Sequence, residues 1–97
     1  MISFRNEKLK SAIIRLSAEF LNREASKQSL ITVTDCEFVG DNQACTIIVS
    51  VFPPDQGKTA LAFLKRKRIE LRDYLRANLR AGRLPRVDFT LASGDKW

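Results

Sequence analysis

Histidine is absent from this 97-residue chain, so the commonest general base and metal ligand among side chains is missing. The two cysteines, Cys36 and Cys45, are too few to form a zinc site on their own. The longest unbroken apolar run covers only residues 60–64, whereas a membrane-spanning helix needs about 20 apolar residues. The first five residues contain no apolar signal core. These absences predict a cytoplasmic protein without metal, cofactor or membrane contact.

Recognisable catalytic patterns are also missing. The carboxylates form no pair at a catalytic spacing, and the sequence has no Gly-rich phosphate loop and no Ser-His-Asp set. Apolar residues make up 44% and charged residues 29% of the chain, which excludes a disordered segment of low hydrophobicity. We expect one globular domain over residues 1–97, with a core from about 5 to 91 and a tail at 92–97. We expect neither enzymatic activity nor a small-molecule substrate.

Few aromatic side chains are available to stack on bases. Four phenylalanines fit core positions better than an exposed platform: Phe20, Phe38, Phe63 and Phe89. Tyr74 and Trp97 are the remaining candidates for surface rings, and neither has supporting context. A base-stacking surface of the RNA-recognition-motif type is therefore not expected.

Positive charge is concentrated in the second half of the chain. Residues 1–48 carry six basic and six acidic side chains, whereas residues 49–97 hold the whole net charge of +6. The segment 65–86 contains nine basic residues against Glu70 and Asp73. A field this concentrated suits a polyanion such as nucleic acid, or less well an acidic membrane. The alternative is a solvated helix face, which usually mixes charges of both signs.

The first half of the chain predicts one helix and two strands. Residues 5–24 place apolar side chains at spacings of three and four, as in an amphipathic helix. Residues 30–39 are rich in β-branched side chains, but their apolar positions change parity, which requires a bulge near Thr34-Asp35. A turn at residues 40–42 leads to a second, antiparallel strand at 43–52, which Pro53-Pro54 ends.

The two cysteines fall on these two strands. If the hairpin turns through Gly40 and Asp41 alone, Cys36 lies opposite Cys45. Even directly opposed residues are slightly too far apart for an unstrained bridge. We therefore expect two free thiols, largely buried, that act as small apolar side chains.

The second helical region, residues 59–81, has an interrupted apolar stripe. One face carries five leucines: Leu61, Leu64, Leu71, Leu75 and Leu79. Between Leu64 and Leu71, where the spacing calls for an apolar residue, the sequence has Arg68. A straight helix would turn this guanidinium towards the core at a large cost. Arg68 could extend to the rim of the core and leave the helix straight. We expect instead a bend or a broken backbone hydrogen bond within residues 65–70, which turns Arg68 out and Ile69 in. Gly82 and Pro85 then end the helix, and residues 87–91 predict a third strand.

Basic side chains flank the leucine stripe. On a helical wheel Lys65, Arg72, Arg76 and Arg83 fall within an arc of about 40°. Arg72 and Arg76 could simply extend over the edge of the core, but few acids lie nearby in sequence to pair them. We favour a row of phosphate contacts. The candidate RNA-binding residues are Lys65, Arg66, Lys67, Arg68, Arg72, Arg76, Arg80, Arg83 and Arg86.

Several segments, in order, resemble the ribosome-binding factor A family. Ile31-Thr-Val-Thr-Asp-Cys-Glu-Phe38 resembles the family's Val-Thr-Val-Thr-Asp-Val strand, and Asp41 follows at the family's turn. Leu71-Arg72, Leu75 and Leu79-Arg80 match its helix, and Arg83-Leu84-Pro85-Arg86-Val87-Asp88-Phe89 matches its Arg-Val-Pro-x-Leu-x-Phe ending. The sequence departs from the family at Ser26-Lys-Gln-Ser29, which replaces an Asp-Pro-Arg-x-Gly linker, and at Lys67-Arg68-Ile69, where the family has an Ala-x-Gly kink.

The resemblance implies an α+β, type II K-homology-like domain in α-β-β-α-β order, with a kinked second helix and helices on one face of a three-stranded sheet. It implies a non-enzymatic assembly factor that binds 16S ribosomal RNA, supports maturation of the small ribosomal subunit, matters for growth in the cold, and is a monomer off the ribosome. The alternatives are a general nucleic-acid-binding domain of this fold and a protein-interaction module whose basic face meets an acidic partner.

Overall fold

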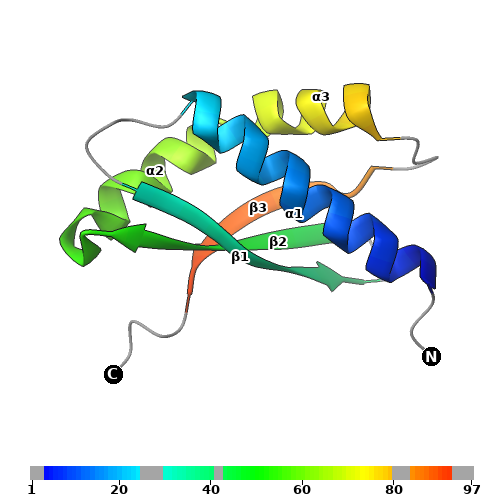
Figure 1. Cartoon of the computed structure of the whole chain (residues 1–97), viewed down its shortest axis with the longest axis horizontal. Helices are drawn as coiled ribbons and strands as arrows, with labels where there is room; N and C mark the ends of the chain where they lie inside the picture. Colours follow the sequence, from blue (N-terminus) through cyan, green and yellow to red (C-terminus); the bar gives the residue numbers. More distant parts are fainter. Residues whose placement is uncertain (1–3, 25–29, 41–42, 80–83, 93–97) are drawn as a thin grey trace.

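The computed structural model describes residues 4–24, 30–40, 43–79 and 84–92, with the side chains of residues 4–6 left out. Helix α1 spans Phe4–Glu24, and strands β1 and β2 span Leu30–Val39 and Ala44–Phe52. A short 3-10 turn at Pro54–Gln56 leads into α2 (Gly57–Arg66), and α3 (Arg68–Asn78) and β3 (Arg86–Leu91) complete the chain (Figure 1). The predicted elements are confirmed, except that the last helix ends at Asn78, before Gly82, which lies outside the described residues.

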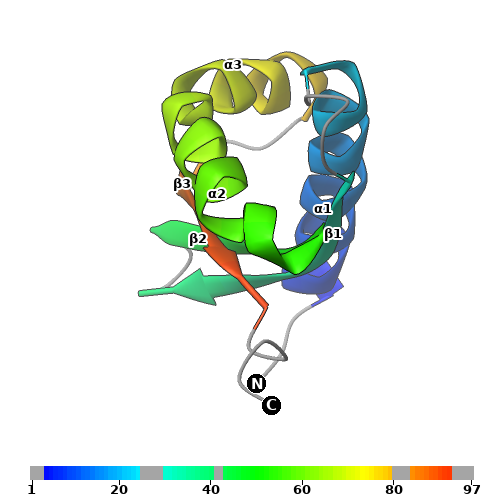
Figure 2. The same cartoon turned by 90° about the vertical axis from the view of Figure 1, so that its left-hand side faces the viewer.

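The three strands form one mixed sheet in the order β1-β2-β3. Strand β1 pairs with β2 in antiparallel fashion, and β2 pairs with β3 in parallel. The crossover between β2 and β3 carries α2 and α3, and these helices and α1 lie on the same face of the sheet (Figure 2). The predicted α+β architecture, with helices on one face of a three-stranded sheet, is therefore confirmed.

The predicted bulge lies where β1 changes parity. The register with β2 shifts between Val33 and Asp35, and the Thr34 hydroxyl donates a hydrogen bond to the backbone oxygen of Ile48 at 3.1 Å. The Asp35 carboxylate accepts from the backbone N–H of Cys36 at 2.7 Å. This hydrogen bond and the neighbouring Lys10 ammonium, 3.3 Å away, lower the pKa of Asp35. The bulge thus has its own polar partners.

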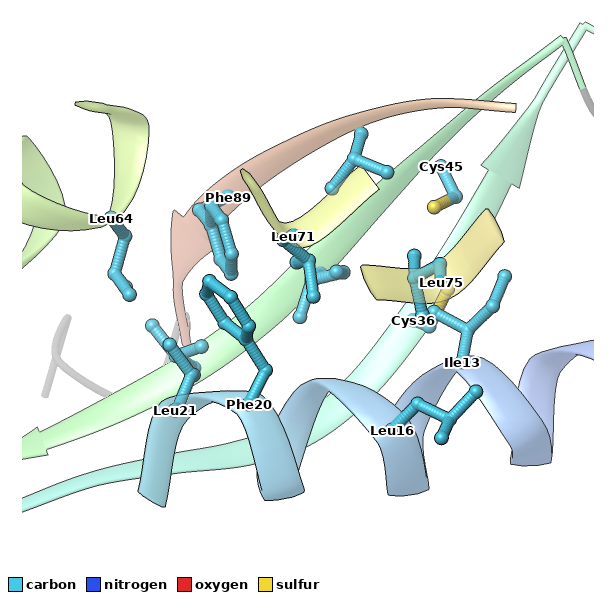
Figure 3. Packing of buried hydrophobic residues seen from close by; sticks show 13 residues of the cluster. Ile13, Leu16, Phe20, Leu21, Cys36, Cys45, Leu64, Leu71, Leu75 and Phe89 are labelled. Carbon is cyan, nitrogen blue, oxygen red and sulfur yellow. The ribbon is translucent and has the colours of Figure 1, made fainter. Parts of the chain in front are cut away.

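The core lies between the sheet and the helices (Figure 3). Helix α1 contributes Ile13, Leu16, Phe20 and Leu21, and the strands contribute Cys36, Cys45, Ile47, Val49, Val87 and Phe89. Leu64 of α2 and Leu71 and Leu75 of α3 complete it, all three fully buried. Among the described residues, no helix is both long and apolar enough to cross a membrane.

The hairpin register differs from the one considered for a two-residue turn. The connection spans residues 40–43, so Val39 pairs with Ala44. Cys36 therefore lies opposite Ile47, and Cys45 lies opposite Phe38. The two thiols are free and buried, as predicted. The hydrogen bond between them and the burial of the site raise the pKa of Cys45.

Tyr74 is a packing residue and not the exposed ring considered from the sequence. Its ring lies 5.7 Å from that of Phe20, between centroids, and the Arg23 guanidinium carbon lies 5.2 Å above it. The Tyr74 hydroxyl donates a hydrogen bond to Glu19 at 3.2 Å. These contacts join α3 to the second half of α1. Trp97 lies outside the described residues.

Candidate nucleic-acid interface

The second helical region breaks at Lys67, within the predicted interval. Lys67 has φ −97° and ψ 5°, and it separates α2 from α3. Its N–H donates to the Leu64 oxygen at 2.9 Å, three residues back, and its own oxygen accepts from the N–H of Leu71 at 2.9 Å. The backbone hydrogen bond at the break therefore spans three residues instead of four, and the next one again spans the four residues of an ordinary α-helix.

The break turns Arg68 away from the core. The Arg68 side chain is 48% exposed, and its Nε donates a hydrogen bond to the backbone oxygen of Lys65 at 3.0 Å. The expectation that Ile69 turns inward is wrong, since Ile69 is 76% exposed. Leu64 and Leu71, on the two sides of the break, are both fully buried, so the apolar stripe continues across the break without Ile69.

Lys67 is held by acidic residues from two helices. Its Nζ lies 3.4 Å from Glu24 Oε1 at the end of α1 and 3.4 Å from Glu70 Oε2 in α3. Hydrogen bonds to these two carboxylates raise the pKa of Lys67. Its ammonium also lies 5.7 Å from the centroid of the Phe63 ring. Lys67 therefore fastens the break to α1 and faces solvent with only a quarter of its side chain.

Asp88 of β3 joins two of the candidate cations. Its Oδ1 lies 3.0 Å from Lys65 Nζ and 3.5 Å from a terminal nitrogen of Arg68. Burial alone would raise the pKa of Asp88. Hydrogen bonds from Lys65 and from the N–H of Phe89, together with the charges of Lys65 and Arg68, outweigh this effect, so the pKa of Asp88 lies below its ordinary value. The carboxylate is therefore ionised at neutral pH.

Four of the candidate cations have acidic partners, and the interpretation that few acids lie near Arg72 and Arg76 is wrong for Arg76. Asp88 pairs with Lys65 and Arg68, Glu24 with Lys67, and Asp73 with Arg76 at 3.2 Å. Asp88 and Glu24 come from distant parts of the sequence, which sequence neighbours could not reveal. Exposed ion pairs contribute only about 0–1 kcal/mol, so Lys65, Arg68 and Arg76 can exchange these partners for a phosphate.

The remaining arginines differ in exposure. Arg66 and Arg86 are exposed and have no acidic partner among the residues that the structure describes. Arg72 is half-buried, and one of its terminal nitrogens donates to the Leu84 oxygen at 3.4 Å. Arg72 therefore extends over the edge of the core, which was the alternative to a phosphate contact. Arg80 and Arg83 lie outside the described residues.

The exposed cations gather where the break meets β3. Arg68 and Arg86 line one pocket of about 460 Å³, and Lys65 reaches the same Asp88 that lines it. We call Lys65, Arg66, Arg68 and Arg86 the basic corner. The sequence pointed to all four side chains through their charge. The pocket was missed, because it combines the ends of β1, β2, β3 and α3, and only the fold brings these together.

Comparison with protein families gives a match that covers almost the whole chain. The family model described as ribosome-binding factor A matches residues 5–94. The chain belongs to the ribosome-binding factor A family. A comparison with curated protein sequences finds no match.

Solved structures agree with the family assignment. The crystal structure of ribosome-binding factor A from Thermus thermophilus is 26% identical, with a TM-score of 0.78, over 88% of this chain and 93% of that one. A Thermotoga maritima protein solved in solution by NMR shares the fold, at 24% identity and a TM-score of 0.77, over 93% of this chain and 89% of that one. A homology model of the Thermus thermophilus factor, fitted into a cryo-EM map of its 30S complex, is 26% identical, with a TM-score of 0.75, over 89% and 93% of the two chains.

Proposed function

We propose that this chain is an assembly factor that binds the small ribosomal subunit and contacts 16S ribosomal RNA through the basic corner. The observation that carries the proposal is the gathering of exposed cations at the helix break. The family match and the fit of a relative's homology model into a 30S complex support the subunit as partner. The chain's charge of +6 supports RNA as the surface that is bound.

Each candidate residue has a role in this proposal. Lys65, Arg66, Arg68 and Arg86 contact phosphates, and Arg76 extends the surface along α3. Arg80 and Arg83 continue it beyond the described residues. Arg72 contributes charge from a half-buried position, while Lys67 fixes the break that presents the corner. The chain acts as a single K-homology-like domain, without enzymatic activity, as a monomer in the cytoplasm, and it supports RNA maturation and growth in the cold.

Two other functions would give different results when the purified chain is sedimented with ribosomal particles. A general nucleic-acid-binding domain would bind RNA without preferring the subunit, and a protein-interaction module would bind an acidic protein and no RNA. The test is co-sedimentation of the purified chain with small subunits and with mature 70S ribosomes. We expect retention on free small subunits and loss of retention at high salt. Equal binding to both particles, or to neither, would contradict the ribosomal role.

A further inference from the structure

We propose that Glu24, the last residue of α1, is a positioning residue for RNA binding, because it holds Lys67 and thereby fixes the direction in which the helix break presents its cations. This inference rests on the proposed RNA-binding function and gives a role to a side chain that itself contacts no RNA. A carboxylate near a polyanion ordinarily weakens binding by repulsion. Glu24 strengthens binding instead, through its contact with Lys67.

Glu24 and Lys67 form the most sheltered ion pair of the described residues. Lys67 Nζ lies 3.4 Å from Glu24 Oε1, and the two side chains are only 25% and 28% exposed. In every other ion pair of the described residues the carboxylate is 48–65% exposed. Shelter from water strengthens a charge pair and hinders the approach of a phosphate. Lys67 therefore keeps Glu24 when Lys65 and Arg68 exchange Asp88 for RNA.

Glu24 can fix the break because α1 is anchored in the core. Phe20 and Leu21, one helical turn before Glu24, are buried. Glu70, the second partner of Lys67, lies three residues further along the chain in α3 and is 57% exposed. It moves together with the break and cannot hold it against the rest of the molecule. The contact that ties Lys67 to a separately anchored element is the one with Glu24, 43 residues away in the sequence.

The direction of the chain at Lys67 decides where the basic corner points. Lys67, with φ −97° and ψ 5°, is the one residue between α2 and α3. Lys65, Arg66 and Arg68 lie within two residues of it, so a small rotation at this hinge moves all three relative to Arg86 of β3. The need to keep Arg68 out of the core accounts for the presence of the break, and the tie to Glu24 fixes its direction. Cations held in one arrangement before binding lose less conformational freedom when the RNA arrives.

The test compares two glutamates of α1 in the binding of the full chain to purified small ribosomal subunits. Glu24→Gln should raise the dissociation constant about fivefold, since the released break samples other directions. Glu19→Gln is the matched control, because Glu19 also joins α1 to α3, through the 3.2 Å hydrogen bond from the Tyr74 hydroxyl. Its hydrogen bonds among the described residues come from Arg15 and Tyr74 and not from the break.

The two variants lose the same charge, so their effects on affinity separate repulsion from positioning. Glu19→Gln should leave the dissociation constant unchanged or lower it by up to about twofold, because it removes a negative charge that repels RNA. Urea unfolding should show similar stabilities for Glu19→Gln and Glu24→Gln, so that weaker binding of Glu24→Gln reflects a misdirected corner and not a lost fold.

A double-mutant cycle shows whether Glu24 acts through Lys67. Lys67→Gln should weaken binding by itself, and Glu24→Gln should then add no further weakening. Unchanged or tighter binding by Glu24→Gln alone would overturn the positioning role and leave the proposed function intact. Equal weakening by Glu19→Gln, or a full further loss when Glu24→Gln is added to Lys67→Gln, would also overturn it. Failure of the unmodified chain to bind small subunits would overturn both the positioning role and the proposed function.

Discussion

Arg68 Nε lies 3.0 Å from the backbone oxygen of Lys65 and donates a hydrogen bond to it across the helix break. The guanidinium thus satisfies one of the carbonyl groups that the end of α2 leaves without an intrahelical partner. The break itself needs no glycine, because φ −97° and ψ 5° at Lys67 are accessible to any L-residue. This explains how the chain keeps a kink where its relatives are expected to have Ala-x-Gly.

Replacing both Arg72 and Arg76 with alanine should weaken RNA binding and reduce its salt dependence. Each lost phosphate contact lowers the slope of log affinity against log salt by about one unit, so we expect a reduction of about one to two units. The measurement is the dissociation constant at several salt concentrations. Arg15→Ala is the control, because Arg15 is exposed on α1 and pairs with Glu19 much as Arg76 pairs with Asp73.

Because Arg72 is half-buried, its replacement alone should also lower the free energy of unfolding, by about 1 kcal/mol through lost packing. Arg76→Ala should change stability little, since the Arg76–Asp73 pair is exposed. An unchanged salt slope in the double variant, with the fold intact, would place the RNA surface elsewhere.

Tyr74→Ala should destabilise the contact between α1 and α3. The ring packs against Phe20 and lies under Arg23, so its loss should lower the free energy of unfolding by about 2–3 kcal/mol. Tyr74→Phe keeps the ring and loses only the hydrogen bond to Glu19, which should cost less than about 1 kcal/mol. Urea unfolding of both variants measures the difference. Equal effects would mean that the hydroxyl, and not the ring, carries the contact.

Apolar spacing predicted the elements well because it depends only on neighbours in the sequence. The change of parity in β1 located the bulge at Thr34-Asp35, and the misplaced Arg68 located the helix break. The register of the hairpin could not be fixed in the same way, because it depends on the length of the turn. Because the connection has four residues instead of two, the cross-strand partner of Cys36 is Ile47 and not Cys45.

Acidification should weaken the fold through Asp88. Its pKa in the folded chain lies below the ordinary value of 3.8, so the unfolded chain takes up a proton first as the pH falls. The carboxylate's contribution to stability is complete above about pH 5 and is lost as the pH drops through the folded pKa. Asp88→Asn should therefore be less stable than the unmodified chain at pH 7, and this difference should shrink at about pH 3.

Urea unfolding at the two pH values measures this change. Asp55→Asn is the control, since Asp55 is exposed and has no ion-pair partner among the described residues. A stability difference for Asp88→Asn that stays constant from neutral to acidic pH would show that the charge of Asp88 does not stabilise the fold.

Both cysteines should react with an alkylating reagent only when the chain unfolds. Cys36 and Cys45 are fully buried and free, so the reagent must wait for an opening of the core. Mass spectrometry of protein kept reduced during lysis should show two adducts after unfolding without reductant. It should show almost none after a brief exposure of the folded chain. Two rapid adducts in the folded chain would contradict the packing of this part of the sheet.

The candidate site could be predicted only in part from the sequence. The charge run contained all four residues of the basic corner. Three of them, Lys65, Arg66 and Arg68, stay together because they are neighbours in the chain, whereas Arg86 comes from β3. The acidic partners Asp88 and Glu24 lie 23 and 43 residues away from the lysines that they bind. Such pairs, and a pocket that combines Val39 with Ile69, exist only once the sheet and helices have packed.

Arg68→Leu should shift the break at Lys67 towards a continuous helix. Leucine at position 68 would complete the apolar stripe between Leu64 and Leu71 and would remove the cost of burying a guanidinium, which is what disfavours the straight helix here. It would also remove the hydrogen bond to the Lys65 oxygen. The amide-to-Hα coupling of Lys67, measured by NMR, reports its φ and should fall as φ moves from −97° towards the helical value of about −63°. Arg66→Leu is the matched control, since it makes the same change at an exposed position and should leave the coupling unchanged. If Arg68→Leu also leaves it unchanged, the break is held by Lys67 and its pairs with Glu24 and Glu70, and not by the need to keep Arg68 out of the core.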